Sequence, residues 1–165
     1  MFQKLCVLTI AIFAAFVSMD CSAGYPLFAD QTTLDVIIEM PMQTIVNDAE
    51  DRPEVPGVLR YIDAGTEVAL DFTMSTRGHS RLEYCRFPPL SMNLKRGLVD
   101  GTMFEGQNKQ KIVTQCKRDR EHERYLIQEI GIYRGVNIVK DKSFRILALS
   151  VTFKDWEGTR KDEVH

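Results

Sequence analysis

The residue types best suited to chemistry gather in the middle of this 165-residue chain. Arg77, Arg81 and Arg86 fall within ten positions, and the aromatic residues Tyr84 and Phe87 are interleaved with them. Guanidinium groups pair with phosphate and carboxylate through two parallel hydrogen bonds. The segment therefore predicts an anion-binding patch that would also suit a glycan or an acidic partner. A structural interpretation stays open, in which the arginine-glycine pair begins a turn and the following prolines set an extended edge.

Other combinations of reactive side chains give little support for catalysis or metal binding. His79 and His122 lie 43 positions apart and have no flanking carboxylates at metal-ligand spacing. Ser80 adjoins His79, but sequence neighbours rarely meet the geometry that activates a nucleophile. The residues themselves predict no metal, no cofactor and no complete catalytic constellation, so enzymatic activity stays open.

The N-terminus has the pattern of a secretory signal peptide. A short positive start with Lys4 is followed by an uncharged apolar run over residues 5–17, and Cys21-Ser22-Ala23 offers small residues for cleavage after Ala23. A retained anchor is disfavoured because the run is shorter than the roughly 20 residues that span a bilayer. Acylation of Cys21 is disfavoured because Met19-Asp20 precedes it. We expect an exported protein, periplasmic or secreted, with no stable membrane insertion after cleavage.

Export determines how the cysteines are interpreted. Cys6 and Cys21 would leave with the signal, so the mature chain would keep Cys85 and Cys116 in an oxidising compartment. A disulfide between these two is expected, and two buried thiols are the alternative. The pair has no CxxC spacing, so zinc and redox motifs gain no support.

Bulk composition is that of one globular domain. The chain is 44% hydrophobic and carries a net charge of −2. Proteins that bind nucleic acid normally show a basic excess, so we expect no nucleic-acid partner.

The elements that would position these residues alternate between strand and turn patterns. Strands are predicted over residues 34–39, 57–62, 67–75, 89–94, 111–116 and 144–153, and the second and third form a hairpin. Asp119 can cap a helix reaching about residue 136, with Leu126, Ile130 and Tyr133 as its core-facing stripe. The fold class is therefore α+β: a mainly antiparallel sheet with one principal helix packed on one face. Residues 24–165 are predicted to form this single domain, which could be truncated at its C-terminus.

Five sequence blocks stand out between residues 77 and 155: Arg77-Gly78, Cys85-Arg86-Phe87-Pro88-Pro89-Leu90, Phe104-Glu105-Gly106-Gln107, a Lys109-Gln110-Lys111 strand ending at Cys116, and Tyr125-Leu126-Ile127-Gln128-Glu129. In these blocks, residues 77–155 resemble a family of uncharacterised bacterial secreted proteins. The same layout is more distantly similar to the N-terminal lobe of the spore-coat protein H kinases, which have a protein-kinase-like fold.

The kinase-like resemblance implies a nucleotide pair. Lys111, or alternatively Lys109, would neutralise the phosphates of ATP bound with Mg²⁺, and Glu129 would hold that lysine. The chain departs from the kinase pattern, because residues 98–107 lack GxGxxG and no catalytic-loop or metal-binding aspartate motif follows. Lys111 as a solvated strand residue and Glu129 as the partner of a neighbouring base are the simpler interpretations.

Two functional hypotheses follow. The first is an exported binding or structural module of the bacterial envelope that meets a partner protein, a glycan or an anionic ligand. The second is the nucleotide-lobe fragment of a kinase-like enzyme.

Overall fold

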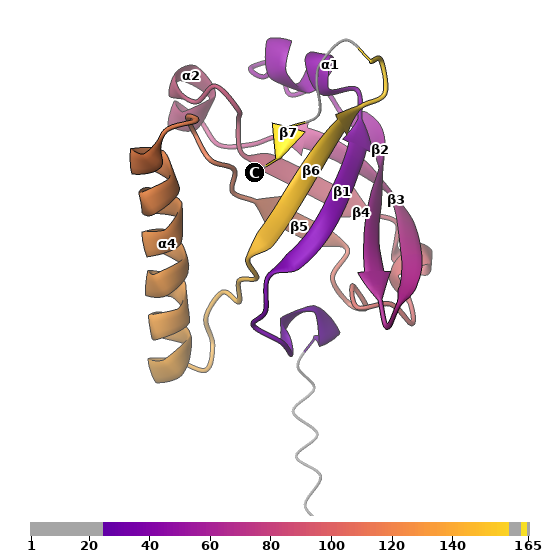
Figure 1. The fold of residues 1–165 in the computed structure, drawn as a ribbon, viewed down its shortest axis with the longest axis vertical. Helices are drawn as coiled ribbons and strands as arrows, with labels where there is room; N and C mark the ends of the chain where they lie inside the picture. The colour runs from indigo at the N-terminus through magenta and orange to yellow at the C-terminus, as the bar shows by residue number, and fades with distance from the viewer. Residues whose placement is uncertain (1–24, 159–162, 165) are drawn as a thin grey trace, which may run out of the picture.

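The chain folds as an α+β domain built on one sheet and one long helix (Figure 1). A computed structural model describes residues 25–158 and 163–164, so the predicted signal peptide over residues 1–23 lies outside the described residues. Within the described part, no helix has the length and apolar character needed to cross a membrane. The elements are η1 (Pro26–Phe28), β1 (Leu34–Met40), α1 (Met42–Asn47), β2 (Val55–Asp63), β3 (Thr66–Thr76), α2 (Ser80–Tyr84), β4 (Leu90–Leu94), α3 (Arg96–Val99), β5 (Lys109–Ile112), α4 (Arg120–Val139), β6 (Leu149–Asp155) and β7 (Glu163–Val164).

The sheet is mainly antiparallel, as predicted. Its strand order is β5-β4-β3-β2-β1-β6-β7, and every neighbouring pair is antiparallel except β1 and β6. The sheet curls, so that β4 and β5 lie behind β6 and β1 in Figure 1. Helix α4 connects β5 to β6 and stands beside the sheet (Figure 1).

The predicted hairpin is confirmed as β2 and β3, which pair from Val55↔Met74 to Asp63↔Thr66. Ala64 and Gly65 form its turn with φ angles of 47° and 83°. Two successive positive φ angles match the right-handed twist of the flanking strands. The turn therefore fixes the register that the alternating apolar residues require.

The core fills the inner face of the curled sheet. Phe87, which precedes β4, lies 4.9 Å from Phe153 of β6 between ring centroids. Gly57 of β2 is needed for close packing, because a Cβ there would overlap the ring of Phe72 and crowd the carbonyl of Glu39. Glycine at this position lets a large aromatic ring cover the neighbouring backbone.

The outer face of the sheet is polar and carries a ladder of ion pairs. Arg60 lies 3.1 Å from Glu39 and 3.1 Å from Glu67, and Lys154 lies 3.9 Å from Glu39. The hydrogen bond to Glu39 is the main cause that raises the pKa of Arg60. This face is the solvent side of the sheet.

Helix α4 begins where the sequence predicts. The Asp119 carboxylate accepts a hydrogen bond from the backbone N–H of His122 at 2.8 Å, which is the geometry of an N-cap. That bond is also the main cause that lowers the pKa of Asp119. The predicted stripe of Leu126, Ile130 and Tyr133 is half-buried, and no residue of α4 reaches the core.

Two predicted strands have different bounds in the structure. The strand predicted over residues 144–153 is wrong in its first half, because β6 begins at Leu149. Its neighbour β1 begins at Leu34, opposite Leu149, so the preceding residues have no strand to pair with. The strand predicted over residues 111–116 is shifted to Lys109–Ile112, because that is the stretch that pairs with β4. Helices α2 and α3 were not predicted.

Candidate functional site

The three predicted arginines lie on one connection between β3 and β4, residues 77–89, which we call the arginine segment. Arg77 follows β3 directly, Arg81 lies in α2 and Arg86 follows α2. No residue of α2 is buried, and Tyr84 is 69% exposed. Arg81 and Arg86 are exposed, whereas Arg77 is half-buried. The segment therefore projects basic and aromatic side chains from the sheet.

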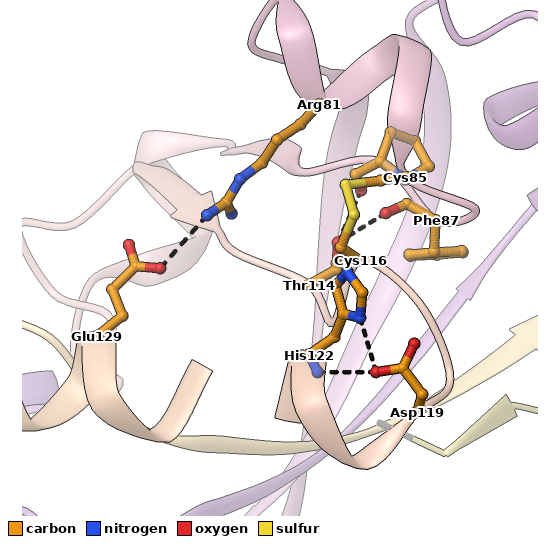
Figure 2. The surroundings of a disulfide bond; sticks show 9 residues. Arg81, Cys85, Phe87, Thr114, Cys116, Asp119, His122 and Glu129 are labelled. Carbon is orange, nitrogen blue, oxygen red and sulfur yellow. Dashed lines mark hydrogen bonds and ion pairs between the residues drawn. A yellow bond between two sulfur atoms is a disulfide. The ribbon is translucent and has the colours of Figure 1, made fainter. Parts of the chain in front are cut away.

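The base of this projection is tied to the rest of the domain by the predicted disulfide. Cys85 and Cys116 are bonded, with their Cα atoms 4.5 Å apart (Figure 2). The Arg86 N–H also donates to the carbonyl of Cys116 at 2.9 Å. The end of α2 is thus joined to the segment that leads from β5 into α4.

Two further hydrogen bonds hold the entrance to the arginine segment. The Arg77 N–H donates to the carbonyl of Pro89 at 2.9 Å, which closes the segment across its own base. The guanidinium of Arg52 donates to the carbonyl of Gly78 at 2.6 Å. Arg52 lies 26 positions away in the chain, and no sequence pattern predicts this contact.

The segment returns to the core through Phe87 and Pro88, which are both buried. The buried hydroxyl of Thr114 lies 3.1 Å from the carbonyl of Phe87 and 3.0 Å from that of Pro88. One hydroxyl proton is shared between these two acceptors. The base of the segment is consequently part of the core, while its tip is solvent-exposed.

Arg81 connects the arginine segment to α4. Its guanidinium points toward Glu129 and lies 3.5 Å from that carboxylate (Figure 2). The two side chains are 48% and 34% exposed. An ion pair this exposed contributes little stability, so its main effect is to orient Arg81 toward the helix.

The structure gives the two residues of the predicted nucleotide pair different neighbours. Glu129 contacts Arg81, whereas the Lys111 ammonium lies 5.8 Å from the centroid of the Phe144 ring. Lys109 and Lys111 are both exposed and lie on the same face of β5, because strand residues two apart point the same way. No contact between either lysine and Glu129 is observed among the described residues.

The described part of the chain offers no site for a metal ion. No group of three or more histidine, cysteine, aspartate or glutamate side chains is placed to hold an ion there. His79 precedes α2 and is exposed, while His122 lies in the first turn of α4, 2.7 Å from the carboxylate of Asp119.

Comparison with known proteins returns no match: no protein-family model, no curated protein and no solved structure is similar to the chain. The resemblance of residues 77–155 to bacterial secreted proteins, and more distantly to kinase lobes, therefore stays a hypothesis based on motifs.

Proposed function

We propose that the protein is an exported module of the bacterial envelope, periplasmic or secreted, that binds an anionic glycan or an acidic partner through the arginine segment. The observation that carries the proposal is the contrast between the base and the tip of that segment. A disulfide and the hydrogen bonds donated by Arg52, Arg77, Arg86 and Thr114 fix the base, while α2 at the tip buries none of its residues.

Rigid presentation of basic side chains favours binding for a physical reason. Ordering a mobile loop at an interface costs about 0.5–1.5 kcal/mol for each immobilised side chain. Ordering the backbone of such a loop is a further cost, and a backbone already held by Cys85–Cys116 avoids it. The exposed Arg86 side chain, beside the disulfide, and Tyr84 at the end of α2 then offer paired hydrogen bonds and an aromatic surface, the combination that suits phosphate, carboxylate or sugar.

The disulfide also supports export. Disulfides form and persist in oxidising compartments and are rare in reducing cytosol. Cys85–Cys116 joins segments 31 residues apart and is the only sulfur bridge among the described residues. A structural bridge of this kind is expected of a protein that works outside the cytoplasm.

The experiment is a calorimetric titration of the exported protein with heparin oligosaccharide and with polygalacturonate, with neutral dextran as a blank. We expect Arg77→Gln/Arg86→Gln to weaken binding by about tenfold, since each guanidinium supplies a charge-assisted hydrogen bond. Arg81 is left intact because it pairs with Glu129.

The matched control is Lys95→Gln/Arg96→Gln, which removes the same two charges from exposed positions at α3. The affinity of this control variant for each polyanion should stay within about twofold of that of the unsubstituted protein, because salt screens charges that lie far from the binding surface. Equal losses from both pairs would show a diffuse charge effect, and no binding to either polyanion would contradict the proposal.

The nucleotide-lobe alternative has one observation in its favour. Glu129 of the principal helix holds a cationic side chain, as a helix glutamate does in kinases. Its cation is Arg81 rather than a lysine of β5. A rise in melting temperature with ATP and Mg²⁺ that Lys111→Ala abolishes would support this alternative, because a ligand that binds only the folded state stabilises it.

A further inference from the structure

Helix α4 has an outer face that no described residue covers. Tyr125, Gln128, Ile132, Gly135 and Val139 follow spacings of three, four, three and four residues, and we call them the outer seam. This spacing places them in one line along a helix, as in the contact line of a coiled coil. All five are exposed, and Ile132 and Val139 are 67% and 83% exposed. The half-buried residues of α4, such as Leu126 and Ile130, lie on the opposite side.

The composition of α4 makes an unpacked helix unfavourable. Its 20 residues include two glycines and six β-branched residues, all of which form helices less readily than alanine. Most of the stability of a helix in a protein comes from packing its apolar face against other elements rather than from helix propensity. Within the described chain the helix is held by Arg81–Glu129 and by a hydrogen bond from Arg134 to the carbonyl of Gln31 at 2.9 Å, and it buries no residue fully. Further packing on the outer seam would stabilise it.

We propose that a second copy of this chain covers the outer seam, so that two α4 helices pair antiparallel about a two-fold axis at Ile132. A two-fold interface must be complementary to itself, and the middle and the two ends of the seam meet this condition. Tyr125 and Val139 lie seven residues to either side of Ile132. Gln128 lies four residues before Ile132 and would face Val136, an exposed residue that borders the seam. Tyr125 of one copy then packs on Val139 of the second.

Three properties of the helix and its surroundings favour this arrangement. A Cβ atom at Gly135 would meet no atom within 4 Å, so nothing in the described chain requires glycine there. A glycine on the seam lets a second helix approach closely. In the antiparallel pair, Glu121 in the acidic first turn also lies opposite the segment of the second copy that carries Lys142. Opposed helix dipoles add a favourable interaction.

The size of the contact sets the strength of the dimer. A helix of 20 residues is about 30 Å long, and one helix pair buries less than the roughly 1,600 Å² of a standard interface. The dimer should therefore be weak, with a dissociation constant on the order of 10–100 μM. It forms at high local concentration and not in dilute solution.

The test is sedimentation velocity of the exported protein from about 5 to 500 μM, a range that brackets this affinity. We expect the monomer to convert to a dimer as concentration rises. Ile132→Asp places two carboxylates on the two-fold axis and should weaken the dimer at least tenfold. The matched control is Ile127→Asp, which makes the same change on the same helix at a residue that is 60% exposed but off the seam. It should dimerise like the unsubstituted protein.

Cysteine cross-linking tests the orientation. Tyr125→Cys mixed with Val139→Cys should form a cross-linked dimer, whereas Tyr125→Cys alone should not, because the antiparallel pair separates the two copies of position 125. A monomer at every concentration, equal effects of the two aspartate variants, or self-cross-linking of Tyr125→Cys would overturn the proposal. Glycan binding at the arginine segment should be the same in Ile132→Asp, so the two proposals fail independently.

Discussion

Removal of the Cys85–Cys116 disulfide should lower the free energy of unfolding by several kcal/mol. The bridge closes a loop of 31 residues. In the chain-entropy description, opening a loop of that size raises the conformational entropy of the unfolded chain by about 12 cal/mol/K, which corresponds to about 3.7 kcal/mol at 25 °C. A domain of this size loses roughly 4 °C of melting temperature for each kcal/mol. We therefore expect the melting temperature to fall by about 15 °C.

The variant is Cys85→Ala/Cys116→Ala, which leaves no unpaired thiol in the segment and needs no reductant. Thermal and urea unfolding followed by circular dichroism give the global loss. Amide hydrogen exchange gives its location: the Arg86 N–H, which is bonded to the carbonyl of Cys116, should exchange much faster. Amides of the β2–β3 hairpin should be affected only through the global loss.

The reasoning fails if the double variant melts within about 3 °C of the unsubstituted protein, less than one kcal/mol for a domain of this size. The remaining hydrogen bonds of the arginine segment would then hold its base without the bridge. The argument from preorganisation would have to rest on those bonds alone.

Three further perturbations test the packing and the capping. Gly57→Ala should lower the free energy of unfolding by about 1–3 kcal/mol because its Cβ overlaps a core ring. Gly97→Ala, which has open space around its Cβ, should leave the urea midpoint almost unchanged. Similar losses of stability in the two variants would contradict the packing argument. Thr114→Val should lower the free energy of unfolding by about 1–3 kcal/mol because two buried carbonyls lose their hydrogen-bond donor. An unchanged urea midpoint would show that the shared hydrogen bond contributes nothing to stability. The pKa of Asp119 is lowered from its ordinary value of 3.8, so its capping contribution to stability is present above pH 3.8 and is lost as pH falls through the lower folded-state pKa. Far-UV circular dichroism should show α4 fraying in that pH window. Asp119→Asn caps the helix without titrating, so this variant should not show the pH-dependent fraying.

Local chemistry predicts much of the sheet and the start of α4. The β2–β3 hairpin follows from alternating apolar residues around a turn with Gly65, and Asp119 was identifiable as a helix cap. These features depend on residues close together in sequence. The disulfide was also predictable, because only one pair of cysteines follows the signal-like segment.

Long-range pairing explains what the sequence did not predict. Residues 144–148 alternate like a strand, yet β1 offers them no partner before Leu34, so Phe144 is left 75% exposed. The Arg81–Glu129 pair joins residues 48 positions apart, and its geometry depends on where α4 lies. A helix stripe predicts which side faces the domain but not how deeply that side is buried.

The most direct test of the proposed function is to map a heparin oligosaccharide onto the protein by NMR chemical-shift perturbation. The arginine segment should respond first, with the largest shifts at Arg77, Tyr84 and Arg86 and a smaller one at Glu129, the partner of Arg81. Shifts that saturate at these residues and weaken with added salt would support the proposed binding surface. Shifts confined to other basic positions such as Lys95 and Arg96, or no shifts at all, would contradict it.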